Sequence, residues 1–214
     1  MFSLKPNQKV VFIGDSITDA GRQSKEAGCA PYGIGYVKIA RDLLIARYPE
    51  YNLRIENRGI GGNTIRSLKA RWQADVIAEK PDVLSIMIGI NDVWRFVANR
   101  PADAVPLEEY EATYRELLKE TQARTGARII LMDPYVIESN RADPFRARMD
   151  TYISCGQRLA REFGATSVRT MDAFDVALKA QPSSYWSQDR VHPDSPGHAV
   201  IALAFLRAIG FELA

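Results

Sequence analysis

Residues 10–19 read Val-Val-Phe-Ile-Gly-Asp-Ser-Ile-Thr-Asp, and this stretch decides the fold. Its four consecutive apolar residues are typical of a strand buried on both faces, as in parallel sheets. Gly14 ends the strand, and Asp15 and Ser16 follow where the chain leaves the sheet. In an open α/β fold, ligands bind at the carboxyl ends of the strands. A serine at this point, flanked by acidic residues rather than by a glycine-rich run, indicates a nucleophile more than a phosphate cradle.

Strands and helices alternate along the rest of the chain. Four further strands are predicted at residues 53–57, 83–88, 129–132 and 166–170. Helical spacing of apolar residues predicts helices at 36–47, from Leu107 to just before Gly126, at 144–163 and at 197–209. Asp143 and Pro144 form an N-cap and a proline at the first helical position. The last helix is almost wholly apolar and is expected to be buried. The alternation predicts one doubly wound, three-layer αβα sandwich with a five-stranded parallel sheet, in a single domain covering residues 1–214.

Composition excludes several classes of function. The chain has 214 residues, of which 25% are charged and 46% hydrophobic, and its formal net charge is +2. These are values of an ordinary globular domain, and without a block of Lys or Arg the chain is not expected to bind nucleic acid. No run of 18 apolar residues occurs, so no membrane-spanning segment is predicted. The two cysteines lie far apart without metal-type spacing, which indicates reduced thiols. The first nine residues contain no hydrophobic signal core, and we therefore expect a cytoplasmic protein.

A long connection at residues 18–35 is rich in glycine. Loops of this length inside compact domains are often functional. It could wall a pocket or form a subunit contact, and the sequence alone does not decide between the two.

Three polar or glycine positions follow the ends of three different predicted strands. They are Ser16, Gly62 and Asn91. Because parallel strands end at one edge of the sheet, we expect these residues to lie close together. The loop at 186–193 precedes the last helix and is expected to reach the same edge.

This loop supplies the two further groups that ester hydrolysis needs. A hydroxyl becomes nucleophilic when a base takes its proton, and the base must be oriented by an anion. Ser16 is the candidate nucleophile, His192 the candidate base and Asp189 the candidate orienting carboxylate. His192 follows Asp189 by three residues, and this short turn lets the Asp189 carboxylate fold back to one ring nitrogen of His192 and leaves the other facing Ser16.

An oxyanion develops in the tetrahedral intermediate and requires hydrogen-bond donors. The backbone N–H groups of Ser16 and Gly62 and the side-chain amide of Asn91 are the candidates. Gly62 is expected to let the backbone approach closely, because it lacks a Cβ atom. No cofactor and no metal are predicted for this mechanism.

Rival interpretations use the same residues. Each residue alone has a structural explanation as a helix cap, a turn or a packed side chain. A metal hydrolase could use Asp189, His192, Asp194 and His198, but that interpretation gives Ser16, Gly62 and Asn91 no role. A flavin-binding module is disfavoured, because Asp15 and Asp19 would repel a phosphate at the end of the first strand. A catalytically inactive sugar-binding or structural protein is a third alternative.

Four motifs in this order resemble the four blocks of the SGNH hydrolases, also called GDSL esterases. The motifs are Gly14-Asp15-Ser16-Ile17, Gly62, Gly89-Ile90-Asn91-Asp92 and Asp189-Arg190-Val191-His192-Pro193. The resemblance spans nearly the whole chain and implies a flavodoxin-like fold. It also implies a catalytic triad of Ser16, His192 and Asp189, with Ser16, Gly62 and Asn91 lining the oxyanion hole. Ile17 replaces the leucine of the family name, which keeps an apolar residue. Thr18 occupies the position of the second glycine of a Gly-x-Ser-x-Gly elbow, which argues against an α/β-hydrolase fold.

Within this family, the motifs are similar to those of bacterial acetylxylan esterases. The resemblance implies an intracellular serine esterase that removes acetyl groups from xylo-oligosaccharides through an acyl-enzyme. Its implied partner is a small ester or an acetylated sugar, and because some members assemble as homo-oligomers, self-association is left open. Lipolytic esterases, lysophospholipases, thioesterases and acyltransferases of the same superfamily remain alternatives. Trp94 and Trp186 lie three residues from Asn91 and Asp189, respectively, and are candidates for substrate binding, with plain packing as the alternative.

Overall fold

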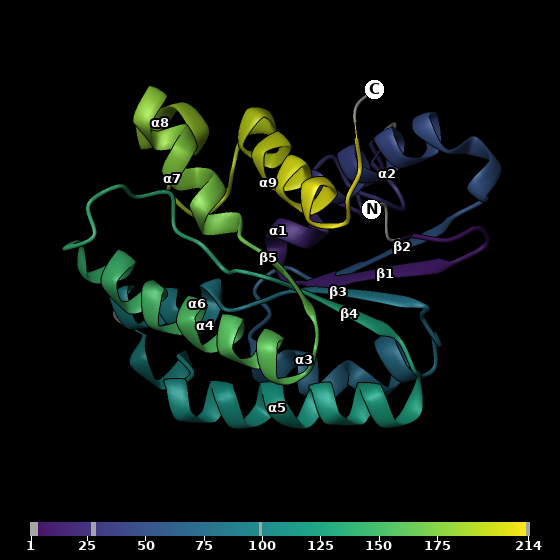
Figure 1. Ribbon diagram of the computed structural model, residues 1–214. Coiled ribbons are helices and arrows are strands. Elements are labelled where there is room, and N and C mark those ends of the chain that lie inside the picture. The colour runs from purple at the N-terminus through teal and green to yellow at the C-terminus, as the bar shows by residue number, and fades with distance from the viewer. Residues whose placement is uncertain (1–3, 27–28, 99, 213–214) are drawn as a thin grey trace.

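The computed structural model describes residues 4–26, 29–98 and 100–212. At its centre lies a sheet of five parallel strands in the order β2-β1-β3-β4-β5 (Figure 1). The strands are β1 (Lys9–Gly14), β2 (Arg54–Gly59), β3 (Val83–Met87), β4 (Arg128–Met132) and β5 (Thr166–Val168). β1 lies inside the sheet, where Gly14 pairs with Gly59 on one side and with Met87 on the other.

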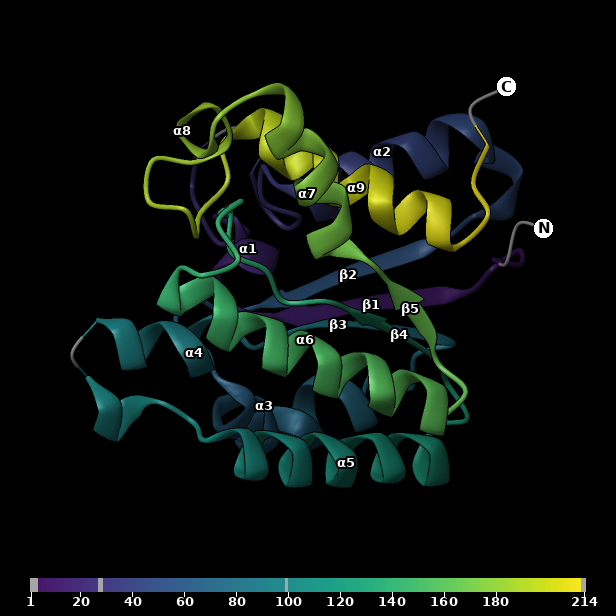
Figure 2. The same cartoon turned by 60° about the vertical axis from the view of Figure 1, so that its left-hand side comes forward.

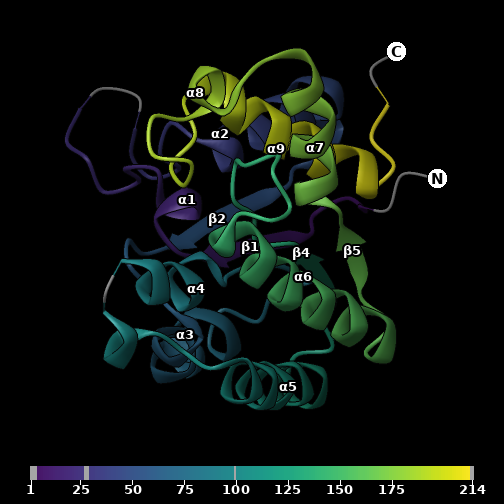
Figure 3. The same ribbon diagram turned by 90° about the vertical axis from the view of Figure 1, so that its left-hand side faces the viewer.

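Helices cover both faces of the sheet and complete three layers (Figure 2). One face carries α2 (Tyr36–Arg47), α7 (Thr170–Ala180) and α9 (Ser195–Ala208). The other carries α3 (Ile65–Trp72), α5 (Leu107–Arg124) and α6 (Pro144–Glu162). Three shorter helices, α1 (Ser16–Asp19), α4 (Ile90–Val97) and α8 (Ser183–Trp186), lie toward the edge where the strands end (Figure 3). Helical turns occur at Pro49–Tyr51, Gln73–Ile77 and Pro101–Asp103. The doubly wound α/β fold predicted from the alternation is confirmed.

The predicted elements agree with the structure in kind and differ in some bounds. Asp143 caps α6 by accepting hydrogen bonds from the N–H groups of Phe145 and Arg146 at 2.9 and 3.1 Å, as predicted. β5 is shorter than predicted and ends at Val168, because the chain turns into α7. Neither α7 nor α8 was predicted, and α9 begins two residues earlier than expected, at Ser195.

The hydrophobic core encloses β1 on both faces. Val10, Val11, Phe12 and Ile13 are fully buried, and the Phe12 ring packs 4.9 Å from that of Phe205 on α9. The prediction that the last helix is buried holds for one face only. Its Leu203 side chain remains 37% exposed on the other face, because α9 lies in the outer layer. Cys29 and Cys155 are both buried free thiols.

The long connection at 18–35 folds back against the end of β2. The side-chain amide of Asn57 donates hydrogen bonds to the carbonyl oxygens of Thr18 at 2.7 Å and Tyr32 at 2.9 Å. Residues 27 and 28 of this connection lie outside the described residues. Within the described part of the chain, the helices are all too short or too polar to traverse a lipid bilayer.

Candidate active site

Ser16 stands at the carboxyl end of β1 as the first residue of α1. The Asp15 carboxylate caps this single helical turn by accepting a hydrogen bond from the Ile17 N–H at 3.0 Å. The turn packs so closely on the sheet that a Cβ atom on Gly14 would lie 2.4 Å from the Met87 carbonyl oxygen. Only glycine fits there, and this fit places the half-buried Ser16 side chain at the rim of the sheet.

His192 faces Ser16 across this rim. Ser16 Oγ lies 3.0 Å from His192 Nε2, and His192 Nδ1 lies 2.7 Å from Asp189 Oδ2. Figure 3 shows the loop before α9 beside α1, although the two segments come from distant parts of the chain. The three side chains form a continuous relay of hydroxyl, imidazole and carboxylate, which is the geometry that activates a serine. The His192 and Asp189 side chains are 50% and 52% exposed, so the relay opens directly to solvent.

The Asp189 carboxylate is held by several donors from its own loop. Its Oδ1 accepts hydrogen bonds from the N–H groups of Val191 at 2.9 Å and His192 at 2.7 Å, and from the Ser187 hydroxyl at 3.0 Å. Partial burial raises the pKa of Asp189, but the hydrogen bonds from His192, Val191 and Ser187 outweigh it and lower the pKa to about 2. Asp189 is therefore ionised at every pH at which an imidazole titrates.

Arg190 fixes the loop between Asp189 and His192. Its backbone φ is 67°, a left-handed conformation that is unfavourable for a residue with a side chain. The Arg190 guanidinium bridges the carboxylates of Glu138 and Asp143 at 2.9 and 3.1 Å. The backbone carbonyl oxygen of Arg190 accepts a hydrogen bond from the Ile137 N–H at 2.9 Å. These contacts hold the strained conformation and, with it, the position of the imidazole.

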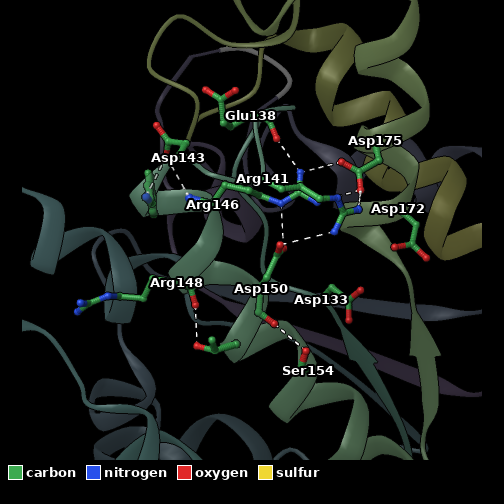
Figure 4. Close-up of polar contacts among 12 residues, drawn as sticks. Asp133, Glu138, Arg141, Asp143, Arg146, Arg148, Asp150, Ser154, Asp172 and Asp175 are labelled. Atoms are coloured by element: carbon green, nitrogen blue, oxygen red, sulfur yellow. Dashed lines mark hydrogen bonds and ion pairs between the residues drawn. The ribbon is translucent and has the colours of Figure 1, made fainter.

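The segment that carries Glu138 is itself anchored by a buried arginine (Figure 4). The Arg146 side chain is 1% exposed, and its guanidinium lies between the carboxylates of Asp150 at 2.8 Å and Asp175 at 2.7 and 2.9 Å. It also donates a hydrogen bond to the Glu138 carbonyl oxygen at 2.6 Å. A buried guanidinium needs such partners, because an unpaired charge in the interior is costly. The hydrogen bonds of Arg146 therefore link α6 and α7 to the segment at Glu138, whose carboxylate binds the Arg190 guanidinium.

The candidate oxyanion donors Gly62 and Asn91 lie on two neighbouring segments. Gly62 has a φ of 76°, and among the described residues no atom lies within 4 Å of the position its Cβ would take. The left-handed backbone therefore favours glycine at this position. The close approach of the Gly62 backbone to an oxyanion stays a prediction. Asn91 lies in the first turn of α4 and is 5% exposed. One N–H of its amide donates to the Asn63 carbonyl oxygen at 3.0 Å, which leaves the second N–H for a ligand.

Two buried carboxyl groups lie beneath this edge of the sheet. Asp15 is 1% exposed and Asp92 is fully buried. Burial raises the pKa of Asp15 to about 7, against a hydrogen bond from Ile17 that lowers it, and the nearby Asp92 raises it further. Burial likewise raises the pKa of Asp92 to about 7, although the Ile65 N–H donates to Asp92 Oδ1 at 3.0 Å. Asp15 and Asp19 both accept hydrogen bonds from nearby backbone N–H groups, those of Ile17 and Arg22.

These two carboxyl groups make stability depend on pH. The unfolded chain ionises them near pH 4, whereas the folded protein keeps protons on them up to about pH 7. The folded state binds more protons in this range, so the free energy of unfolding falls as the pH rises through 7. His198 does not oppose this fall above pH 6.5, because burial lowers its pKa from 6.5 to about 4.

We therefore expect Tm to fall between pH 6 and pH 7.5 and to level off by about pH 8, where both groups are ionised in the folded protein as well. Each kcal/mol lost should lower Tm by roughly 2–4 °C in a domain of this size. Asp92→Asn should flatten the fall, because the amide oxygen can still accept from Ile65 but carries no charge. Thermal unfolding followed by circular dichroism measures both proteins, and a Tm that is constant or rises over this range would contradict the burial argument.

The two candidate tryptophans have different surroundings. Trp94 lies on α4, one turn after Asn91, and is 39% exposed. Trp186 is partly buried against the core, and its indole N–H donates to the Gln181 carbonyl oxygen at 3.3 Å. Its ring also meets that of Tyr185 edge-on at 4.9 Å. Trp94 therefore exposes part of its ring to a ligand. Trp186 packs partly against the core, and its contact with a substrate stays a prediction.

The four residues of the metal-hydrolase interpretation do not come together. His198 is buried, and its Nδ1 accepts a hydrogen bond from the Tyr36 N–H at 3.3 Å. His192 instead contacts Asp189 and Ser16. In residues 4–26, 29–98 and 100–212, no group of three or more His, Cys, Asp or Glu side chains is arranged to hold a metal ion.

Sequence reasoning did not identify the buried supports of the site. The sequence indicated only that Asp92 stands at the start of a helix. Its position next to Asn91 was the signal that could have pointed to a supporting role in the site. Arg146 was not singled out, although Asp150 follows it by one helical turn and such a pair is readable from sequence. Neither signal reveals burial, and burial gives both residues their importance.

Comparison with known proteins identifies relatives along nearly the full chain. The family described as "GDSL-like Lipase/Acylhydrolase family" matches residues 12–200. The acetylxylan esterase of Geobacillus stearothermophilus is 49% identical over 212 residues, which cover 96% of this chain and 95% of the relative. The crystal structure of Axe2, an acetylxylan esterase from Geobacillus stearothermophilus, superposes with a TM-score of 0.93 at 48% identity, covering 98% of this chain and 97% of that one. The crystal structure of LAE5, an alpha/beta hydrolase enzyme from the metagenome of Lake Arreo, has a TM-score of 0.91 at 45% identity and covers 97% of both chains.

Proposed function

Because this chain belongs to the GDSL-like lipase/acylhydrolase family, we propose that it is a serine esterase that removes acetyl groups from xylo-oligosaccharides. Its relatives and family make it a carboxylic ester hydrolase, and its similarity to the acetylxylan esterase of Geobacillus stearothermophilus supports carbohydrate esters as its substrates. The observation that carries the proposed mechanism is the relay from Ser16 Oγ to His192 Nε2 at 3.0 Å and from His192 Nδ1 to Asp189 Oδ2 at 2.7 Å.

In the proposed first half-reaction, Ser16 Oγ attacks the carbonyl carbon of the acetyl ester. His192 Nε2 takes the hydroxyl proton, and the Asp189 carboxylate stabilises the imidazolium that results. The carbonyl oxygen becomes an oxyanion, which accepts hydrogen bonds from the Ser16 and Gly62 N–H groups and from the free N–H of Asn91. When the intermediate collapses, the bond to the sugar oxygen breaks and His192 gives its proton to that oxygen. The acetyl group then remains on Ser16.

The second half-reaction repeats these steps with water as the nucleophile. His192 takes a proton from the water molecule, whose oxygen attacks the acetyl carbonyl carbon. The same three donors stabilise the second oxyanion. Collapse breaks the bond to Ser16 Oγ, returns the proton from His192 to Ser16 and releases acetate. The half-exposed relay leaves room for water to enter.

The exposure of the site to solvent supports an ester substrate with a large alcohol part and a small acyl group. His192 and Asp189 are half exposed, so a bulky sugar chain can present an acetyl group to Ser16 without entering a tunnel. Trp94 offers an exposed aromatic face beside Asn91, which suits a sugar ring. A long acyl chain would need an apolar groove, and the 510 Å³ cavity between α4 and α6 is lined by residues such as Phe96, Leu107 and Tyr152 rather than by the relay.

A substrate panel tests this proposal. p-Nitrophenyl esters from acetyl to decanoyl should be hydrolysed with kcat/KM falling steeply beyond the shortest chains, and acetylated xylo-oligosaccharides should release acetate. A maximum at octanoyl or decanoyl, without acetate release from the sugars, would instead support a lipolytic esterase. Hydrolysis of acyl thioesters in preference to oxygen esters would support a thioesterase, and no hydrolysis of any kind would support an inactive sugar-binding module.

Esterase activity should fall in acid because a protonated imidazole cannot accept the hydroxyl proton of Ser16. Asp189 does not cause this fall, because the hydrogen bonds that outweigh its partial burial lower its pKa to about 2. On the acid limb of the profile we expect kcat/KM to drop by roughly tenfold per pH unit, because a single proton is involved. The measurement is the initial rate of p-nitrophenyl acetate hydrolysis from pH 4 to pH 8. A flat profile down to about pH 4 would exclude histidine as the base.

A further inference from the structure

The loop that carries Gly62 is not held in place by packing. Gly61 and Gly62 are both exposed, and among the described residues nothing lies within 4 Å of a Cβ built on Gly62. Glycine is also the residue with the greatest backbone freedom. The direction of the Gly62 N–H therefore depends on the hydrogen bonds that the loop makes.

Helix α4 supplies three of these hydrogen bonds from a little more than one turn. Arg95 Nη2 donates to the Gly62 carbonyl oxygen at 2.7 Å, and Asn91 Nδ2 donates to the Asn63 carbonyl oxygen at 3.0 Å. Asp92 Oδ1 accepts from the Ile65 N–H at 3.0 Å. α4 thus holds the loop at residues 62, 63 and 65 and at the same time carries the amide of Asn91.

Arg95 is well placed to hold Gly62, because it follows Asn91 by four residues and shares its helix face. Its second guanidinium nitrogen, Nη1, donates to the Asp103 carbonyl oxygen at 3.1 Å. The planar fork therefore spans two backbone carbonyl oxygens, which gives it a fixed orientation. With the Gly62 carbonyl oxygen tied to this fork, the rotation about the Gly62 backbone is restricted and its φ of 76° is maintained.

We propose that Arg95 is a positioning residue of the esterase: it aims the Gly62 N–H at the oxyanion by holding the Gly62 carbonyl oxygen. This inference rests on the proposed function, because it requires Gly62 to be an oxyanion donor. Arg95 does not touch the reacting atoms. Its contribution arises only when charge develops on the substrate oxygen, so it acts on the transition state more than on substrate binding.

Arg95→Met should reduce kcat for p-nitrophenyl acetate by about 10- to 100-fold, because a donor displaced by even 1 Å loses much of its effect. KM should change by less than about twofold, since the ground-state ester carries no oxyanion. Arg95→Lys keeps a cationic donor that can reach one carbonyl oxygen, and its kcat should lie between those of Arg95→Met and the wild type. Rates are expressed per reactive serine, counted by complete labelling with a fluorophosphonate.

The matched control is Arg158→Met, which removes an equal charge from α6. The Arg158 guanidinium pairs with the Glu111 carboxylate and is 49% exposed. We expect this variant to keep the wild-type kcat. Phenylboronic acid is the second probe, because its adduct with a serine places a tetrahedral oxyanion in the site. Its inhibition constant should rise in Arg95→Met by about the same factor as kcat/KM falls.

Three results would overturn the inference: a kcat within twofold of the wild type in Arg95→Met, a rise in KM with kcat retained, or an unchanged boronate inhibition constant beside a lowered kcat. The Ser16→Ala variant separates this outcome from a failure of the proposed function. If Ser16→Ala retains activity, the proposed mechanism is wrong. If Ser16→Ala is inactive and Arg95→Met is as active as the wild type, only the role of Arg95 is wrong.

Discussion

Replacing Ser16 with alanine should reduce ester hydrolysis by on the order of 10⁴- to 10⁶-fold, because the proposed acyl-enzyme forms on the hydroxyl that this substitution removes. The residual rate would come from oxyanion stabilisation and substrate binding, which survive the substitution. The fold should be unaffected. The Ser16 side chain is half-buried, and its hydroxyl bonds to a His192 ring that is half exposed and can turn to water in the variant. The measurements are kcat/KM for p-nitrophenyl acetate and Tm.

Two controls accompany this experiment. Ser154→Ala removes an equivalent hydroxyl from an exposed position on α6 and should leave kcat/KM at the wild-type value. A fluorophosphonate probe should label the wild type and Ser154→Ala but not Ser16→Ala. Hydrolysis by Ser16→Ala within tenfold of the wild-type rate would falsify the assignment of the nucleophile and, with it, the acyl-enzyme mechanism.

Replacing Asn91 with alanine should lower kcat by roughly 100- to 1000-fold, the usual cost of one lost oxyanion donor. KM should change little, because the amide acts on the charge that forms only during the reaction. The loss has a second cause in this structure. The same amide holds the Asn63 carbonyl oxygen at 3.0 Å, so its removal also loosens the loop that carries Gly62.

The control for the Asn91 variant is Asn140→Ala, which deletes an amide from an exposed loop and should keep the wild-type kcat. A double variant of Asn91→Ala and Arg95→Met separates the two causes of the loss. If both residues act on the same loop, the combined fall in kcat should be smaller than the product of the two single falls. An Asn91→Ala enzyme with a kcat within threefold of the wild type would exclude Asn91 as an oxyanion donor.

The layout of the fold was predictable because parallel strands impose strong sequence patterns. The run Val10–Ile13 is apolar at every position, since β1 is covered on both faces, and the convergence of Ser16 with the ends of other strands follows from their shared direction. α7 was missed because no strong cap or apolar run marks it off from β5. The prediction overestimated the burial of α9. An apolar residue such as Leu203 can lie on an outer face, and the sequence carries no signal of this exposure.

The placement of the proposed relay was predictable, and its support was not. The spacing of Asp189 and His192 allowed a turn that brings the carboxylate to the ring, which is where the structure has it. Arg95, Arg146 and Arg190 all act through long side chains that reach other segments of the chain. These long-range contacts depend on the tertiary structure, so they leave no periodic pattern in the sequence. The left-handed φ of Gly62 likewise leaves no signature in the sequence, which indicated only that a glycine lets its backbone come close to the oxyanion.

The distance along the chain between Ser16 and His192 has a consequence for biosynthesis. The two residues are 176 positions apart. After it has incorporated Ser16, the ribosome must therefore add all of the residues between them before it incorporates His192. A nascent or prematurely terminated polypeptide that stops short of this point lacks the proposed general base, and by the proposed mechanism it does not hydrolyse cellular esters.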